Sequence, residues 1–322
     1  MPLDPQIAVI LKFLADAGAP SMSSSTVEHA RAGFRAGTVG VRNPETLAQV
    51  RSVEDITVPG GDGPRAARIY RPDVDGPVPT MVFFHGGGYV IGDIETHDDQ
   101  ARLICRDGAM VVVSVDYRLA PEHKFPAGHE DCLAATRWAA ANIDDLGGDA
   151  TRLVVGGDSA GGNMAATVAL ACRAEGPALA AQFLIYPGID FTEDADYPSR
   201  TENAEGYFLT ADDGLWFRDQ YLPAGVDVAD PRLSPIRADD LSGAAPAIIG
   251  VAEFDPLRDE GLAYGKALAD AGVEVVVRRY DGLIHGFFDL GLLSAAAAKA
   301  VQVGCADFAA LLHQASPAKA LT

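Results

Sequence analysis

The 322-residue chain predicts an α/β fold: one mostly parallel sheet of about eight strands, flanked by helices. Short apolar segments alternate with helical patterns along most of the sequence, as they do where strands and helices follow one another in a single sheet. Six of the apolar segments are nearly continuous, which is typical of parallel strands covered on both faces. Two long stretches break the alternation, and we expect them to form a helical cap.

The strands can be placed in chain order. Residues 53–58 and 67–70 are expected to pair antiparallel, because a glycine-rich turn at 59–63 joins them. The other six strands are expected at 81–84, 110–115, 153–155, 183–186, 247–251 and 273–277. Helices are expected at 97–106, 129–141, 160–174, 259–271 and 294–312.

Two stretches interrupt this order. Residues 1–45 carry helical patterns before any strand, and residues 190–235 form an insertion rich in aromatic residues. An insertion of this length in an α/β domain is usually functional, and ligands bind at the carboxyl ends of the strands. We therefore predict N-terminal cap helices at 1–45, a cap insertion at 190–235, and a catalytic core formed by 46–189 and 236–322.

The first helix is expected to be amphipathic rather than a signal peptide. No basic segment precedes it, and no clear cleavage site follows it. Its apolar residues fall on one helical face: Ile7, Ile10, Leu11 and Leu14. No segment of the chain is expected to reach the length needed to span a membrane.

The composition narrows the range of partners. The formal net charge is −20 and the sequence pI is near 4.6, and such a surface repels nucleic acid and anionic membranes. We therefore expect no nucleic-acid binding and no membrane insertion. Four cysteines lie far apart in apolar contexts, which indicates buried reduced thiols and a cytoplasmic location. They are Cys105, Cys132, Cys172 and Cys305.

The segment 157–161 reads Gly-Asp-Ser-Ala-Gly and joins the strand at 153–155 to the helix at 160–174. A serine hydroxyl becomes a useful nucleophile when a sharp turn holds it clear of the backbone, beside a base and opposite oxyanion donors. Glycines two residues either side of Ser159 allow the strand to turn tightly into the helix. Ser159 is therefore the candidate nucleophile.

A second loop, His-Gly-Gly-Gly-Tyr at 85–89, follows directly on the strand at 81–84. Successive glycines expose backbone N–H groups, and two or three such donors stabilise an oxyanion by several kcal/mol. The N–H group of Ala160, directly after the nucleophile, would complete an oxyanion hole. A histidine in the position of His85 more often fixes the shape of such a loop than acts as a base.

A base and an orienting acid are expected after the serine, in the order serine, acid, histidine. Asp255 lies just past the strand at 247–251 and is the candidate acid, with Glu253 as the alternative. Asp259 is expected to complement the dipole of the helix that follows. His285 follows the last strand and is the candidate base. No H-E-x-x-H motif occurs, so zinc catalysis has little support and no metal site is predicted.

Six motifs now stand in order along the chain. They are H-G-G-G-Y at 85–89, D-Y-R-L-A-P-E at 116–122, G-D-S-A-G-G at 157–162, Y-P at 186–187, D-P-L-R-D-E at 255–260 and H-G-F at 285–287. Together they resemble the hormone-sensitive-lipase family of esterases (bacterial family IV) over residues from about 50 to 312. The resemblance implies an α/β-hydrolase fold with a helical cap.

The resemblance also implies roles for individual residues. The catalytic triad would be Ser159, Asp255 and His285. The oxyanion donors would be Gly87, Gly88 and Ala160, while Gly86 would serve the shape of the loop. Side chains expected to contact the substrate are Tyr89, Tyr207, Phe208, Trp216 and Phe287.

The expected activity follows from the same family. Its members hydrolyse short- to medium-chain acyl esters through an acyl-enzyme intermediate, use no cofactor and are often dimers. We therefore expect a serine carboxylesterase with a small-molecule ester substrate, in a homodimer. Two alternatives stay open: an amidase or arylformamidase with the same triad, and a non-catalytic small-molecule binding protein on this fold.

Overall fold

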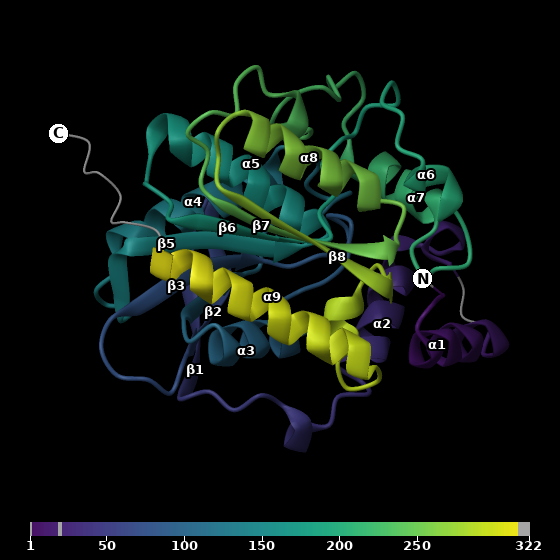
Figure 1. The fold of residues 1–322 in the computed structure, drawn as a ribbon, viewed down its shortest axis with the longest axis horizontal. Coiled ribbons are helices and arrows are strands. Elements are labelled where there is room, and N and C mark those ends of the chain that lie inside the picture. Colours follow the sequence, from purple (N-terminus) through teal and green to yellow (C-terminus); the bar gives the residue numbers. More distant parts are fainter. Residues whose placement is uncertain (1, 19–20, 315–322) are drawn as a thin grey trace.

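The structure, a computed structural model, describes residues 2–18 and 21–314 and contains a single eight-stranded sheet (Figure 1). The strand order is β1-β2-β4-β3-β5-β6-β7-β8. The bounds are β1 Ser52–Gly60, β2 Gly63–Arg71, β3 Val78–Phe84, β4 Val111–Val115, β5 Gly148–Asp158, β6 Ala181–Ile185, β7 Ala247–Phe254 and β8 Val275–Ile284. β2 pairs antiparallel with β1 and β4, and all other neighbouring strands are parallel. The predicted α/β class and mostly parallel sheet are confirmed.

Helices cover both faces of the sheet (Figure 1). On one side lie α3 Asp98–Asp107 and α9 Ala295–Gln314; on the other lie α4 Ala127–Ala141, α5 Ala160–Glu175 and α8 Arg258–Asp270. Side chains alternate along β3, so that Met81 and Phe83 join the buried cluster under α3 and α9. Val82 and Phe84 join the cluster under α4, α5 and α8. The nearly continuous apolar runs are therefore explained by burial on both faces.

The remaining helices gather at the end of the sheet toward which the parallel strands point (Figure 1). They are α1 Pro5–Asp16, α2 Val27–Thr38, α6 Ser199–Glu202 and α7 Ala211–Tyr221. The described residues also include short 3-10 helices in the connections between elements: η1 Met22–Ser24, η2 Pro44–Thr46, η3 Pro235–Arg237 and η4 Phe287–Leu290. The N-terminal segment meets the mid-chain insertion directly, since the Ser23 N–H donates to Asp213 Oδ1 at 2.9 Å. In α1, the predicted apolar face is the inner one, with Ile7 fully buried.

Helix α9 corrects one expectation from the sequence. By length and composition, residues 295–313 could cross a membrane. The prediction that no segment reaches the length needed to span a membrane is therefore wrong. In this fold, however, one side of the helix packs on the sheet, and the Phe308 ring stacks on Phe183 with 4.9 Å between centroids. Core packing therefore accounts for the apolar character of α9.

Strand β8 also differs from its predicted form. It starts two residues later than expected and continues to Ile284, and it lies at the edge of the sheet. Its first half is only partly covered, with Val277 37% exposed, because an edge strand has a neighbour on one side only. The prediction of buried, unpaired thiols is confirmed for Cys105, Cys132, Cys172 and Cys305.

Buried His129 leads to a prediction on stability. Its Nδ1 lies 3.0 Å from Thr167 Oγ1, and burial lowers the pKa of His129 to about 4. The unfolded chain binds this proton near pH 6.5 but the folded chain only near pH 4, so the free energy of unfolding falls as the pH drops through this window. Relative to His129→Gln, the wild type should lose about 2 kcal/mol between pH 8 and pH 5. Urea denaturation at both pH values measures this; an unchanged difference between the two proteins would contradict it.

Candidate active site

Ser159 occupies a sharp turn between β5 and α5, with a φ of +53°. Its N–H donates to Ile185 O at 2.8 Å, which fixes the turn to the neighbouring strand. A Cβ atom at Gly161 would lie 1.9 Å from Phe84 O, and one at Gly157 would lie 2.4 Å from Gly161 O. Both glycines are therefore required by close backbone approach, and the strained serine is held clear of the sheet. We call residues 157–161 the nucleophile elbow.

Three strand ends bring Ser159, His285 and Asp255 together. His285 Nε2 lies 2.9 Å from Ser159 Oγ, and His285 Nδ1 lies 2.7 Å from Asp255 Oδ2. The three residues directly follow β5, β8 and β7, whose carboxyl ends lie at one edge of the sheet. A serine nucleophile is activated when its hydroxyl is hydrogen-bonded to an imidazole and that imidazole is hydrogen-bonded to a carboxylate.

Asp255 is fully buried and held by hydrogen bonds from one backbone and one side-chain donor. Its Oδ1 accepts from the Leu257 N–H at 2.8 Å, and its carbonyl oxygen accepts from Asn203 Nδ2 at 3.1 Å. The other two carboxylates near this position have different partners. Glu253 Oε2 accepts from the Gly282 N–H at 2.8 Å, and Asp259 pairs with Arg258. Of the three carboxylates considered from the sequence, Asp255 is the one that contacts His285.

Tyr186 is a neighbour of the imidazole that sequence reasoning did not place at the site. Its ring centroid lies 4.7 Å from that of His285, in a tilted arrangement. A ring at this distance packs against the imidazole and limits the orientations open to it. The signal was present in the Y-P motif at 186–187, but its position directly after β6, next to β5, became clear only from the sheet order.

The loop of residues 85–89, which we call the oxyanion loop, has an unusual backbone. Gly87 has a φ of +110° and Gly88 a φ of +57°. The loop closes on itself, because Gly87 O accepts from the N–H groups of Val90 (3.0 Å) and Ile91 (2.9 Å). The Ala160 N–H belongs to the first turn of α5, where helix N–H groups have no partner within the helix.

His85 is buried within this loop. Its Nδ1 lies 2.8 Å from Gly86 O, its ring stacks on Tyr117 at 4.4 Å, and its carbonyl oxygen accepts from Tyr117 Oη at 2.7 Å. Burial lowers the pKa of His85 to about 4, so the imidazole is neutral near pH 7. These contacts support the interpretation that His85 holds the shape of the loop.

Two aromatic side chains of the insertion lie beside the residues described above. Phe208 is half exposed, and its ring would lie 3.4 Å from a Cβ atom at Gly286, next to His285. The Phe217 ring, in α7, would lie 2.3 Å from a Cβ atom at Gly88. Phe217 was missed, although its neighbour Trp216 was predicted, because the docked face of α7 cannot be read from its sequence alone.

The other predicted substrate contacts occupy different surroundings. Tyr89 is buried and its ring stacks on Tyr221 at 3.9 Å. Phe287 is also buried, with rings of the core around it. Tyr207 packs on the Phe254 ring at 4.8 Å, while Trp216 packs against the core cluster and stays partly exposed. Their substrate contacts stay predictions.

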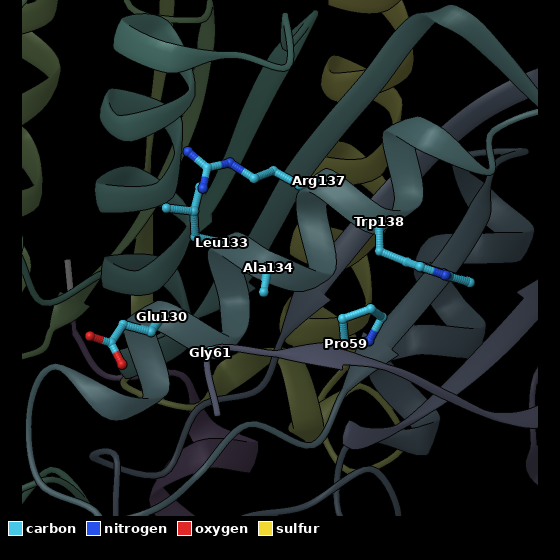
Figure 2. A pocket seen from close by; sticks show the side chains of 7 residues that line it. All are labelled: Pro59, Gly61, Glu130, Leu133, Ala134, Arg137 and Trp138. Carbon is cyan, nitrogen blue, oxygen red and sulfur yellow. The ribbon is translucent and has the colours of Figure 1, made fainter. Parts of the chain in front are cut away.

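A surface groove of about 610 Å³ lies elsewhere, between α4 and the hairpin formed by β1 and β2 (Figure 2). It is lined by Pro59, Gly61, Glu130, Leu133, Ala134, Arg137 and Trp138. None of the predicted site residues lines this groove, so it is separate from the Ser159 site. Within residues 2–18 and 21–314, no group of three or more His, Cys, Asp or Glu side chains is placed to hold a metal ion.

Comparison with known proteins gives consistent matches. A family model described as the α/β hydrolase fold matches residues 81–289. The carboxylic ester hydrolase LipN of Mycobacterium tuberculosis is 44% identical over 296 residues, which cover 89% of this chain and 77% of that protein. An ethyl acetate hydrolase of Pseudomonas putida is 35% identical, with 90% and 93% covered. The hyperthermophilic esterase of Pyrobaculum calidifontis is 42% identical and superposes with a TM-score of 0.92, with 97% and 99% covered.

Proposed function

Because this chain belongs to the α/β-hydrolase-fold family, in its hormone-sensitive-lipase (bacterial family IV) branch, we propose that it hydrolyses carboxylic esters at Ser159. One observation carries the assignment of the site. His285 lies between the Ser159 hydroxyl and the Asp255 carboxylate, within hydrogen-bond distance of both. The protein is thus a serine carboxylesterase that acts on short- to medium-chain acyl esters and needs no cofactor.

The first half of the reaction forms an acyl-enzyme. His285 Nε2 takes the Ser159 proton while Oγ attacks the ester carbonyl carbon, and the carbonyl oxygen becomes an oxyanion. Asp255 keeps the imidazole in the correct tautomer and stabilises its charged form. The N–H groups of Gly87, Gly88 and Ala160 are the proposed donors to the oxyanion. Collapse of the intermediate breaks the bond to the alcohol, which leaves with the proton from His285.

The second half repeats these roles with water. His285 takes a proton from a water molecule, whose oxygen attacks the acyl carbon bound to Ser159. The same backbone donors hold the second oxyanion. When this intermediate collapses, the carboxylic acid is released and Ser159 recovers its proton from His285.

A substrate panel tests the function against its alternatives. The protein is offered p-nitrophenyl acetate, butyrate and caprylate beside an aryl amide of matched acyl length. We expect kcat/KM to be much higher for the esters than for the amide, with an acyl-enzyme detectable by mass spectrometry. Faster cleavage of the amide would favour an amidase, and tight binding without turnover would favour a binding protein.

Phe217 leads to a prediction on acyl-chain length. Its ring covers Gly88, so it limits the space above the proposed oxyanion donors. Phe217→Ala should raise the ratio of kcat/KM for caprylate to that for butyrate by about tenfold, since one methylene contact is worth about that much in a closed pocket. Trp216→Ala is the matched comparison. If only the Trp216 variant shifted the ratio, Trp216 rather than Phe217 would set the limit.

We propose further that residues 2–18, 21–45 and 190–235 form the cap over a catalytic core of 46–189 and 236–314; residues 1, 19–20 and 315–322 of the predicted ranges lie outside the part of the chain that the structure describes. The hydrogen bond between Ser23 and Asp213 supports a joint cap, and the Phe217 contact supports its position over the site. The four free cysteines support the proposed cytoplasmic location. A homodimer rests on the family resemblance, and light scattering of the purified protein tests it.

A further inference from the structure

Asp158, the residue before the nucleophile, makes a contact that the ester mechanism does not use. Its Oδ1 accepts from the Gly86 N–H of the oxyanion loop at 2.8 Å. The carboxylate is almost completely buried, so this bond is not weakened by water. A Cβ atom at Gly86 would clash with Asp158 Oδ2, at a distance of 2.4 Å. The absence of a side chain at Gly86 is therefore what allows the carboxylate to approach the loop.

His97 is the charge partner of Asp158. Its Nε2 lies 3.7 Å from Asp158 Oδ1, its Nδ1 lies 2.9 Å from Thr96 Oγ1, and the side chain is 2% exposed. Burial alone would lower the pKa of His97, but the Asp158 carboxylate, together with Asp289 and the Asp93 backbone, raises it. In turn, His97 and the Gly86 N–H hold the pKa of Asp158 below its usual value despite burial. The two side chains therefore favour each other's charged form in a buried part of the molecule.

The position of Asp158 in the chain gives this pair its effect. Asp158 ends β5 and is bonded directly to Ser159, while Gly86 precedes the two proposed oxyanion donors, Gly87 and Gly88. One hydrogen bond therefore joins the residue before the nucleophile to the residue before the proposed oxyanion donors. A shift of this bond would change the distance between the attacking oxygen and the donors, on which transition-state stabilisation depends.

We propose that Asp158 and His97 are positioning residues: a buried ion pair that clamps the oxyanion loop to the nucleophile elbow. The pair touches neither the substrate nor the reacting atoms, and acts through the Gly86 N–H. His97 serves by keeping the carboxylate ionised, since an unpaired buried carboxylate would take up a proton or draw in water. This inference rests on the proposed ester hydrolysis.

The test compares Asp158→Ala with Asp158→Asn on p-nitrophenyl butyrate. The alanine variant should lower kcat about 100-fold, the effect of losing one oxyanion donor, while KM stays within about threefold. The asparagine variant should stay within about tenfold of the wild type, because its amide oxygen still accepts from the Gly86 N–H. Equal loss in both variants, or a loss confined to KM, would overturn the proposal.

Inhibition by a trifluoromethyl ketone separates the proposed role from a general loss of stability, because the inhibition constant reports on the oxyanion donors. The ketone adds to the serine and forms an oxyanion, so its inhibition constant should rise in Asp158→Ala by the same factor as kcat falls. Unchanged inhibition would show that the donors are still in place and would overturn the clamp. If the alanine variant does not fold, His97→Gln takes its place, with the same matched changes in kcat and inhibition expected.

His129→Gln is the control for the histidine change. His129 is equally a buried histidine, but it bonds to Thr167 on α5 and not to the oxyanion loop. The His129→Gln variant should keep kcat and the inhibition constant close to the wild-type values. A fall in kcat as large as that of His97→Gln would contradict a specific role for His97. Inactivity of the wild type toward every ester would instead count against the proposed function.

Discussion

Replacing Ser159 with alanine is expected to lower kcat for p-nitrophenyl butyrate by at least about 10⁴-fold. The Ser159 hydroxyl oxygen is the atom that forms the acyl-enzyme. His285 Nε2 lies 2.9 Å from it and makes no hydrogen bond to any other hydroxyl among the described residues. The remaining rate should be the small contribution of the oxyanion donors and of substrate binding. Initial rates at saturating substrate measure the loss, and mass spectrometry should find no acyl-enzyme.

The matched control is Ser114→Ala. Ser114 lies in β4, is fully buried, and among the described residues its hydroxyl has no hydrogen-bond partner. Removing that hydroxyl should leave both turnover and stability near the wild-type values. Ser159→Ala should also keep the wild-type unfolding temperature, which separates loss of chemistry from loss of fold. Turnover like the wild type in Ser159→Ala would show that another group is the nucleophile.

Much of the fold could be predicted because its strands have a simple physical signature. Strands buried on both faces are apolar at most positions, so the central parts of β3 to β7 stand out from the helices between them. β8 was the least accurate, since an edge strand is covered less and tolerates charged residues such as Arg278 and Arg279. The order of residues along the chain then placed Ser159, Asp255 and His285 at one edge of the sheet.

Other parts of the site depend on how distant segments dock. Trp216 and Phe217 are adjacent on α7 and equally aromatic, and only the seating of that helix decides which ring covers Gly88. Phe287 follows His285 closely in sequence, yet its ring lies in the core. Likewise, nothing in the local pattern indicates that Asp158 bonds to Gly86, 72 residues earlier. Side-chain direction at helix faces and loop ends is a tertiary property.

His285→Ala is expected to lower kcat nearly as much as the loss of the nucleophile, by about 10⁴-fold or more. Without the imidazole, the Ser159 proton has no acceptor, and the leaving alcohol has no donor. More substrate cannot restore the rate, because the lost step follows binding. The rate is therefore measured at saturating substrate. His123→Ala is the control, since His123 is exposed and precedes the serine; it should keep wild-type turnover.

The double variant tests whether the two residues act as a unit. If His285 serves only to activate Ser159, removing both should cost no more than removing either alone. A further fall of several powers of ten in the double variant would mean that the residues contribute independently, and that the 2.9 Å contact between them is not the catalytic one. Loss of turnover in His123→Ala with activity kept in His285→Ala would assign the base to a different histidine and contradict the order serine, acid, histidine.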